Sequence, residues 1–234
     1  MVGMSLENNL KSVAHQIEKA CVASGRDPRS VRLVAVSKTK PISTVRSALA
    51  AGQQIFGENY VQEALEKSAA LPEAEWHLIG SLQTKKVKSV VGHFRLIHSV
   101  DRLKLAAEIS KAASKMDVVQ DILLQIHVGN EETKSGVSFE EAPSIIREIL
   151  ALPNLRLCGL MALPPRTTDE GKGRAAFASV RDALVRWKSE LMIGQAAEDF
   201  CELSMGTSSD FEWAILEGAT LVRVGTSIFG AREV

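Results

Sequence analysis

The sequence has few of the residues that build metal sites and disulfide frameworks. Its three cysteines, Cys21, Cys158 and Cys201, lie far apart, are odd in number and form no CxxC pair, which argues against disulfides and against a zinc site. The five histidines show neither HxxxH nor HExxH spacing, which leaves metal binding without support. We therefore expect no metal ion, and we interpret the cysteines as small core residues.

The chain also has no excess of positive or negative charge, and it contains no long hydrophobic run. Lys plus Arg and Asp plus Glu both number 28, which gives a formal net charge of +0, so nucleic acid is not expected as a principal partner. No apolar stretch approaches the roughly 20 residues of a membrane span, and residues 5–16 are polar and contain no signal-peptide core. These absences predict a cytoplasmic protein with no membrane partner.

What the chain does contain is a regular alternation of short apolar runs and amphipathic helical stretches. After an amphipathic helix over residues 5–24, eight apolar runs are each followed by a helical pattern. Eight such units predict an α/β protein with a single closed (β/α)8 barrel, a TIM barrel, over residues 1–234, with residues 1–28 as a leading helix packed on it. A doubly wound open sheet is the alternative. The expected strands are 31–37, 54–57, 75–80, 95–100, 119–128, 155–162, 200–204 and 220–225, and the residues expected to open helices include Ser43, Asp101, Ser138 and either Ser208 or Ser209.

Lys38 lies at the end of the first expected strand. The apolar run from Val31 to Val36 ends in Ser37-Lys38-Thr39, so a buried strand brings an amine to the rim of the sheet, where ligands bind in α/β folds. Partial removal of water there favours the neutral amine, which is the form that attacks a carbonyl carbon to give a Schiff base. A Lys after a strand is more often a solvated loop residue, so this interpretation depends on what lies beside it.

Two small, hydroxyl-rich turns follow the last two strands. Residues 204–210 and 223–227 each lead from a strand toward a helix. Glycine lets the backbone approach an anion closely, and N–H groups at helix starts favour one. Either turn alone is typical of an ordinary helix cap, but phosphate sites recur at this position in barrels.

A closed barrel would place strand one beside strand eight. Lys38, the cationic Arg223 and the two turns would then surround one pocket, which suits an aldehyde that carries a phosphate. Pyridoxal 5′-phosphate (PLP) is the best candidate.

Several motifs occur in order along residues 31–232. They are AVSKTKP (35–41), FGENYVQE (56–63), WHLIG (76–80), KSG (134–136), GLM (159–161), LSMG (203–206), and VRVGT (222–226) with FGAR (229–232). In this order they closely resemble the pyridoxal phosphate homeostasis protein family. The resemblance implies a barrel like the alanine racemase N-terminal domain, of PLP fold type III, in which Lys38 carries PLP as an internal aldimine.

The resemblance also implies the remaining site residues and the function. Arg223 would face the pyridine nitrogen, and Asn59, His77 and Met161 would line the ring, although His77 is equally well interpreted as a hydrogen-bonded core residue. The implied function is to buffer or deliver PLP, with apo PLP-dependent enzymes as recipients, without robust catalytic activity and as a monomer. The residues expected around the phosphate are Ser204, Gly206, Thr207, Ser208, Gly225 and Thr226.

An amino-acid racemase is the alternative function. A racemase needs a second base opposite Lys38 and a strong electron sink. The only tyrosine is Tyr60, and a permanently cationic Arg223 against the ring nitrogen weakens the sink. A Schiff-base aldolase without a cofactor is a third possibility. Lys134 could form a second PLP site, although a solvated loop lysine is the favoured interpretation.

Overall fold

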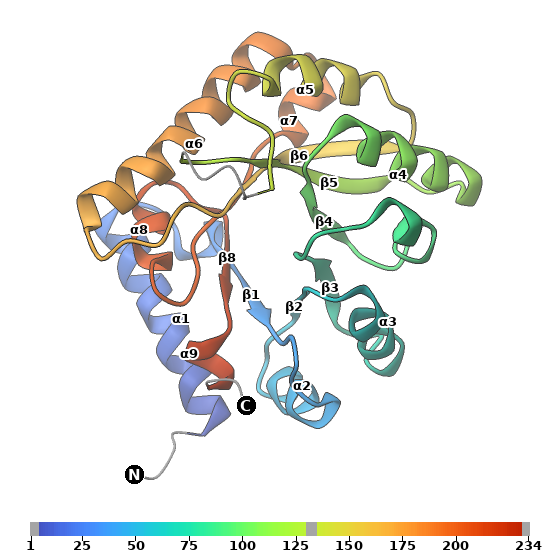
Figure 1. Cartoon of the computed structure of the whole chain (residues 1–234). Coiled ribbons are helices and arrows are strands. Elements are labelled where there is room, and N and C mark those ends of the chain that lie inside the picture. The colour runs from blue at the N-terminus through green and yellow to red at the C-terminus, as the bar shows by residue number, and fades with distance from the viewer. Residues whose placement is uncertain (1–4, 130–134, 231–234) are drawn as a thin grey trace.

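The structure is a computed structural model that describes residues 5–129 and 135–230, and it shows a closed barrel of eight parallel strands (Figure 1). Each strand lies beside the next in sequence order, and the last pairs with the first to close the sheet. The predicted barrel is therefore confirmed, and the open sheet is excluded. The strands are β1 Arg32–Val36, β2 Ile55–Glu58, β3 Glu75–Leu78, β4 Leu96–Val100, β5 Gln120–Ile126, β6 Leu155–Ala162, β7 Glu202–Ser204 and β8 Leu221–Val224.

Helices lie outside the ring of strands (Figure 1). The longest, α6, follows the sixth strand and contributes Phe177, Val180 and Trp187 to the core. A 3-10 helix replaces the regular helix after the third strand. The described helices are α1 Leu6–Ala23, η1 Pro28–Ser30, α2 Ile42–Ala50, α3 Val61–Ala70, η2 Thr84–Ser89, α4 Leu103–Met116, α5 Ala142–Leu150, α6 Glu170–Leu191, α7 Gln195–Asp199, α8 Phe211–Leu216 and α9 Thr226–Phe229.

Several predicted helix starts were wrong. α2 begins at Ile42 after Pro41, one residue before the expected cap Ser43, because the fixed φ of proline suits the position before a helix. α4 begins after Arg102 rather than after Asp101. In α8 the residue before the helix is Asp210, whose carboxylate accepts the backbone N–H of Thr207 at 2.6 Å and so closes the preceding turn instead.

Apolar side chains pack on both faces of the barrel strands. The larger layer lies between the strands and the helices, and a smaller cluster fills the barrel interior. Strands that are buried on both faces carry continuous apolar runs, which is why the strands could be located from the sequence. The inner cluster consists of Val34, Leu96, Leu123, Cys158, Met161 and Leu221, with Ile55 packed against it.

Two of the three cysteines belong to the core, as expected. Cys21 and Cys158 are buried, whereas the interpretation of Cys201 as a core residue was wrong, since Cys201 is exposed just before β7. Burial raises the pKa of the Cys158 thiol to about 12, so this thiol stays protonated and unreactive near neutral pH.

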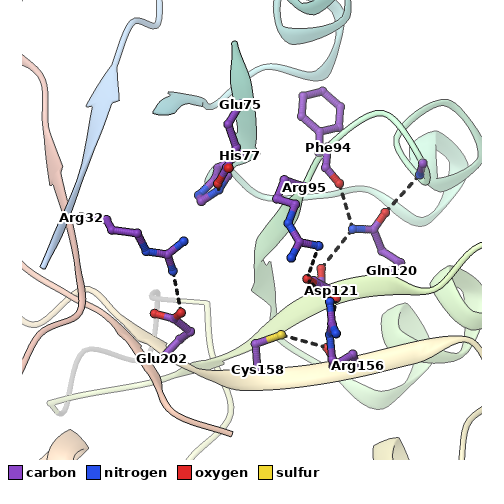
Figure 2. A network of polar contacts seen from close by, with 11 residues as sticks. Arg32, Glu75, His77, Phe94, Arg95, Gln120, Asp121, Arg156, Cys158 and Glu202 are labelled. Carbon is purple, nitrogen blue, oxygen red and sulfur yellow. Dashed lines mark hydrogen bonds and ion pairs between the residues drawn. The ribbon is translucent and has the colours of Figure 1, made fainter. Parts of the chain in front are cut away.

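The amino-terminal end of the barrel carries ion pairs across its interior (Figure 2). Arg32 contacts Glu202 at 2.5 Å. Asp121 is contacted by Arg95 at 2.6 Å and by Arg156 at 2.7 Å. Since these pairs occupy the amino-terminal end, we expect a ligand to approach from the carboxyl-terminal end, where barrel sites are found.

Helix α1 packs against α8, α9 and α2. Its buried side includes Val13 and Ile17, and the side-chain amide of Asn9 donates to the carbonyl of Ile228 in α9 at 2.9 Å. Just after α1, the guanidinium of Arg26 donates to the carbonyls of Ile215 in α8 and of Ala219 before β8, each at 2.9 Å. The leading helix therefore helps to hold the closing strand in place.

Within the described ranges, no helix is both long and apolar enough to span a membrane. The same residues contain no group of three or more His, Cys, Asp or Glu side chains that could hold a metal ion.

Candidate functional site

The seam between β1 and β8 brings the two ends of the sequence together. Leu33 pairs with Val222, and Ala35 pairs with Val224. One residue beyond this pairing, a Cβ on Gly225 would lie 3.3 Å from Val36. The structure therefore places the turn that carries Lys38 next to the turn after β8.

The turn that carries Lys38 has an unusual backbone. Thr39 adopts a φ of 64°, which is uncommon for a residue other than glycine and marks local strain. The backbone N–H of Thr39 donates to the Glu63 carboxylate at 2.6 Å, so a side chain of α3 holds this conformation. Lys38 itself is partly buried.

A buried ion network lies beneath the Lys38 turn. The ammonium of Lys67 donates to the Ser37 carbonyl, to Glu58 and to Glu63, each at 2.7 Å. The Ser37 hydroxyl donates to the same Glu58 oxygen at 2.6 Å. Burial raises the pKa of Glu58, although the hydrogen bonds from Lys67 and Ser37 oppose that shift. The network ties α3 and β2 to the end of β1, and sequence analysis missed it because Lys67 has the pattern of an ordinary polar helix residue.

The turn after β7 leaves no room for a side chain at Gly206. Its φ is 90°, and a Cβ there would lie 2.6 Å from the Cβ of Ala214 and 2.9 Å from the Cα of Phe211. The hydroxyl of Ser208 in this turn accepts the backbone N–H of Gly225 at 3.1 Å. This bond links the two turns predicted to hold a phosphate, and Thr226 begins α9 at the second turn.

Arg223 lies inside the barrel just below these turns and is only 4% exposed. One terminal nitrogen donates to the hydroxyl of Ser204, and the other donates to the carbonyl of Ala162 at 2.9 Å. Burial lowers the pKa of Arg223 to about 10, so the guanidinium stays charged near neutral pH. The side chain presents a fixed cation at the carboxyl-terminal end of the barrel.

His98 is a buried site residue that sequence analysis missed. Its Nδ1 lies 2.8 Å from the Ser204 hydroxyl, and its Nε2 lies 2.9 Å from Nδ1 of His77. The Nε2 of His77 lies 2.8 Å from Glu75. Burial lowers the pKa of both histidines, and that of His98 falls well below its usual value. The interpretation of His77 as a hydrogen-bonded core residue therefore describes its contacts, and a ring-lining role for it stays a prediction.

Asn59 contains an unsatisfied acceptor. Its Oδ1 is buried and has no hydrogen-bond partner among the described residues. The Asn59 backbone packs so closely on Gly80 that a Cβ on Gly80 would lie 2.1 Å from the Asn59 carbonyl oxygen. Buried acceptors normally have partners, so this atom is suited to a ligand.

Met161, Tyr60 and Lys134 are the remaining residues that the sequence singled out, and the ring-lining role of Met161 stays a prediction. Met161 is buried near the carboxyl end of β6, where it pairs with Ser204 of β7, and its side chain belongs to the inner apolar cluster. Tyr60, the only tyrosine, is 56% exposed at the start of α3. Lys134 lies outside the described residues.

Comparison with known proteins identifies the family. A family model described as the alanine racemase N-terminal domain matches residues 8–233. A protein of Pseudomonas aeruginosa called pyridoxal phosphate homeostasis protein is 45% identical, and the match covers 98% of this chain and 96% of the relative. This chain belongs to the pyridoxal phosphate homeostasis protein family.

Two further proteins match this chain over nearly their full length. The Aquifex aeolicus pyridoxal phosphate homeostasis protein is 42% identical, with 98% of this chain and 100% of the relative covered. The solved structure of PipY from Synechococcus elongatus PCC7942, described as having PLP bound, superposes with a TM-score of 0.81 at 35% identity. That match covers 97% of this chain and all of PipY.

Proposed function

We propose that this protein binds PLP at the carboxyl-terminal end of the barrel and buffers or delivers the cofactor. The observation that carries the proposal is the β1–β8 pairing, which sets Lys38 beside the Gly206 and Gly225 turns and above Arg223. The family relationship and the PLP bound in PipY support the same ligand.

The residues at this end of the barrel fit the chemical groups of PLP. The two linked turns offer backbone N–H groups, hydroxyls and a close approach at Gly206 to a phosphate. Arg223 can donate a hydrogen bond to a pyridine nitrogen from the N–H groups that Ser204 and Ala162 leave unused. The unsatisfied oxygen of Asn59 can accept a hydrogen bond from a ring hydroxyl. In this proposal Ser204, Thr207, Ser208 and Thr226 line the phosphate side.

Lys38 supplies the covalent chemistry in this proposal. Its neutral amine attacks the aldehyde carbon, a carbon–nitrogen double bond forms, and the carbonyl oxygen leaves as water. Bound PLP would supply a reactive aldehyde and an electron-accepting ring. The protein contributes the amine, its orientation and the surrounding donors.

The residues of the proposed site suit binding of the cofactor better than catalysis on amino acids. A charged Arg223 beside the ring nitrogen disfavours protonation of that nitrogen and so weakens the ring as an electron sink. Tyr60 is largely exposed, which makes it a poor second base. We therefore propose a non-catalytic cytoplasmic protein that acts as a monomer and passes PLP to apo enzymes.

Borohydride trapping tests the covalent site. The protein loaded with PLP should be yellow, should lose its colour on reduction, and should carry the label on Lys38 in a peptide map. Lys38→Ala should lose the covalent chromophore, whereas Lys40→Ala, two residues along the same loop, should keep it. Label on another lysine only, with a normal chromophore in Lys38→Ala, would refute the proposal.

The alternative functions give different results with the same protein. Steady conversion of L- or D-amino acids above the rate of free PLP would establish a racemase. A colourless preparation that does not take up PLP but is trapped by a sugar phosphate would indicate an aldolase.

A further inference from the structure

A chain of hydrogen bonds crosses the barrel interior from Arg223 to the amino-terminal end. It runs from Arg223 to the hydroxyl of Ser204, then to His98, to His77 and finally to Glu75. These five residues come from β8, β7, β4 and β3. The three middle side chains are at most 1% exposed, whereas the side chain of Glu75 is 35% exposed and lies among the ion pairs of Figure 2.

When both histidines are neutral, as the burial that lowers their pKa values favours, the two ends of this hydrogen-bond chain allow only one arrangement of its protons. A guanidinium can only donate hydrogen bonds, and an ionised carboxylate can only accept them. Glu75 therefore requires a proton on Nε2 of His77, which leaves Nδ1 of His77 as an acceptor for the Nε2 proton of His98. Nδ1 of His98 must then accept the Ser204 hydroxyl proton, and the Ser204 oxygen accepts from Arg223. Both histidines are neutral in this arrangement, and each carries its proton on Nε2.

We propose that His98 and His77 are positioning residues of the PLP site, and that their one-way chain of hydrogen bonds to Glu75 keeps Ser204 turned so that Arg223 is held ready for the pyridine nitrogen. The inference rests on the proposed function, because it assigns Arg223 to the ring of PLP. Without Glu75, the proton on His77 can move to Nδ1. His98 would then have to accept at Nε2 and donate at Nδ1, and the Ser204 hydroxyl could no longer donate to it.

The charges around the two histidines also favour the neutral forms. His98 is faced by Arg223 of β8, Arg32 of β1 and His77 of β3, and burial together with these groups lowers its pKa. His77 is faced by Glu75 of its own strand, Glu202 of β7 and Arg32 of β1, and burial outweighs the carboxylates. Protonating His98 would place a third positive charge beside Arg223 and Arg32 in the barrel interior.

A purely structural role is a weaker explanation of these two histidines. The neighbouring inward positions of the barrel are filled by Leu96, Leu123 and Leu221, and burying polar imidazoles costs free energy unless every nitrogen has a partner. The chain supplies a partner for each of the four ring nitrogens. It also ends on Arg223 rather than within the apolar cluster.

Nitrogen NMR of the histidines tests the direction of the chain. In ¹⁵N-labelled full-length protein at pH 7, the two-bond ¹H–¹⁵N spectrum should show His77 and His98 as neutral rings protonated at Nε2. Single His→Gln variants assign the signals, and His93→Gln, at an exposed position, is the control that should leave both unchanged. A charged ring or an Nδ1-protonated ring at either residue would overturn the inference.

Substitution of Glu75 tests the coupling to PLP without touching the binding site. Glu75→Leu removes the acceptor at the partly exposed end, and we expect the His98 signals to move and the dissociation constant for PLP to rise about tenfold, the effect of roughly 1.4 kcal/mol. Glu75→Gln retains an acceptor oxygen and should keep the affinity within about twofold. Thermal unfolding of each variant confirms that it is folded.

The outcomes separate the two proposals. Wild-type protein that fails to bind PLP would remove the proposed function and this inference together. Normal binding by the wild type, with the same affinity and the same His98 signals in Glu75→Leu, would refute the inference alone and leave the PLP site standing.

Discussion

At the scale of single residues, Asn59 shows how the proposed binding site would conflict with stability. Its Oδ1 is buried without a partner among the described residues, and an unsatisfied buried acceptor costs about 1–3 kcal/mol. We expect Asn59→Leu to raise the free energy of unfolding of the PLP-free protein by about 1 kcal/mol and to weaken PLP binding. Urea unfolding and a PLP titration measure the two effects. Loss of stability in the PLP-free protein would show that Oδ1 has a partner.

In the turn of residues 204–210, which we propose holds the phosphate, Gly206 is the residue whose replacement should destabilise the protein most. An alanine at this position would have a φ of 90° and contacts below 3 Å to Ala214 and Phe211. We therefore expect Gly206→Ala to lower the free energy of unfolding by about 3 kcal/mol, through backbone strain and overpacking. Gly52→Ala is the matched control, because Gly52 has a φ of 98° but nothing within 4 Å of the position that a Cβ would take. The free energy of unfolding of this control should fall by only about 1 kcal/mol. If urea unfolding shows equal losses of stability in Gly206→Ala and Gly52→Ala, Phe211 and α8 can shift to accommodate the added methyl group.

At the scale of elements, Lys67 joins α3 to the carboxyl ends of β1 and β2. Its side chain is 4% exposed, and that of its partner Glu58 is fully buried. Removing one partner of such a pair costs about 3–5 kcal/mol. We therefore expect Lys67→Met to lower the free energy of unfolding by that amount at pH 8. Because Lys67 donates to the Ser37 carbonyl, the variant should also loosen the Lys38 turn and weaken PLP binding.

The loss in Lys67→Met should depend on pH. Burial already raises the pKa of Glu58, and the Lys67 ammonium opposes that shift, so the pKa rises further in the variant. An acid whose folded pKa lies above its unfolded pKa adds stability at low pH, and this is lost as pH rises through the folded pKa. Lys67→Met should therefore be less destabilised at pH 5 than at pH 8. The double variant Lys67→Met with Glu58→Gln should be destabilised equally at pH 5 and pH 8. If its loss of stability still depends on pH, a group other than Glu58 is responsible.

The elements themselves were largely predictable from the sequence, whereas the contacts beneath the site were not. Continuous apolar runs marked each strand, because the strands are buried on both faces. Helix starts were less predictable, since Pro41 and Asp210 compete with nearby serines for the same role. His98 was missed because the run Leu96–Val100 indicates only a buried strand, and which of its side chains meet Ser204 depends on barrel closure. Alternation within that run places His98 on the same face as Leu96, which was the one signal available.

At the scale of the whole molecule, the site exists only while the barrel is closed. Lys38 lies near the start of the chain and the turns of Gly206 and Gly225 near its end, and the β1–β8 pairing joins them. Unfolding separates these groups, so PLP should bind the folded state alone. Free PLP at 100 times its dissociation constant should then stabilise the protein by about 2.7 kcal/mol.

Urea unfolding with and without PLP measures this stabilisation. Lys40→Ala should be stabilised by PLP as much as the wild type at the same ratio of PLP to dissociation constant. This variant retains Lys38 and the turns of Gly206 and Gly225. Lys38→Ala should show little effect at the wild-type PLP concentration, since the covalent bond is lost. Equal stabilisation of Lys38→Ala would mean that the turns and Arg223 alone supply the affinity. In that case closure of the barrel, rather than the covalent bond, would control retention of the cofactor.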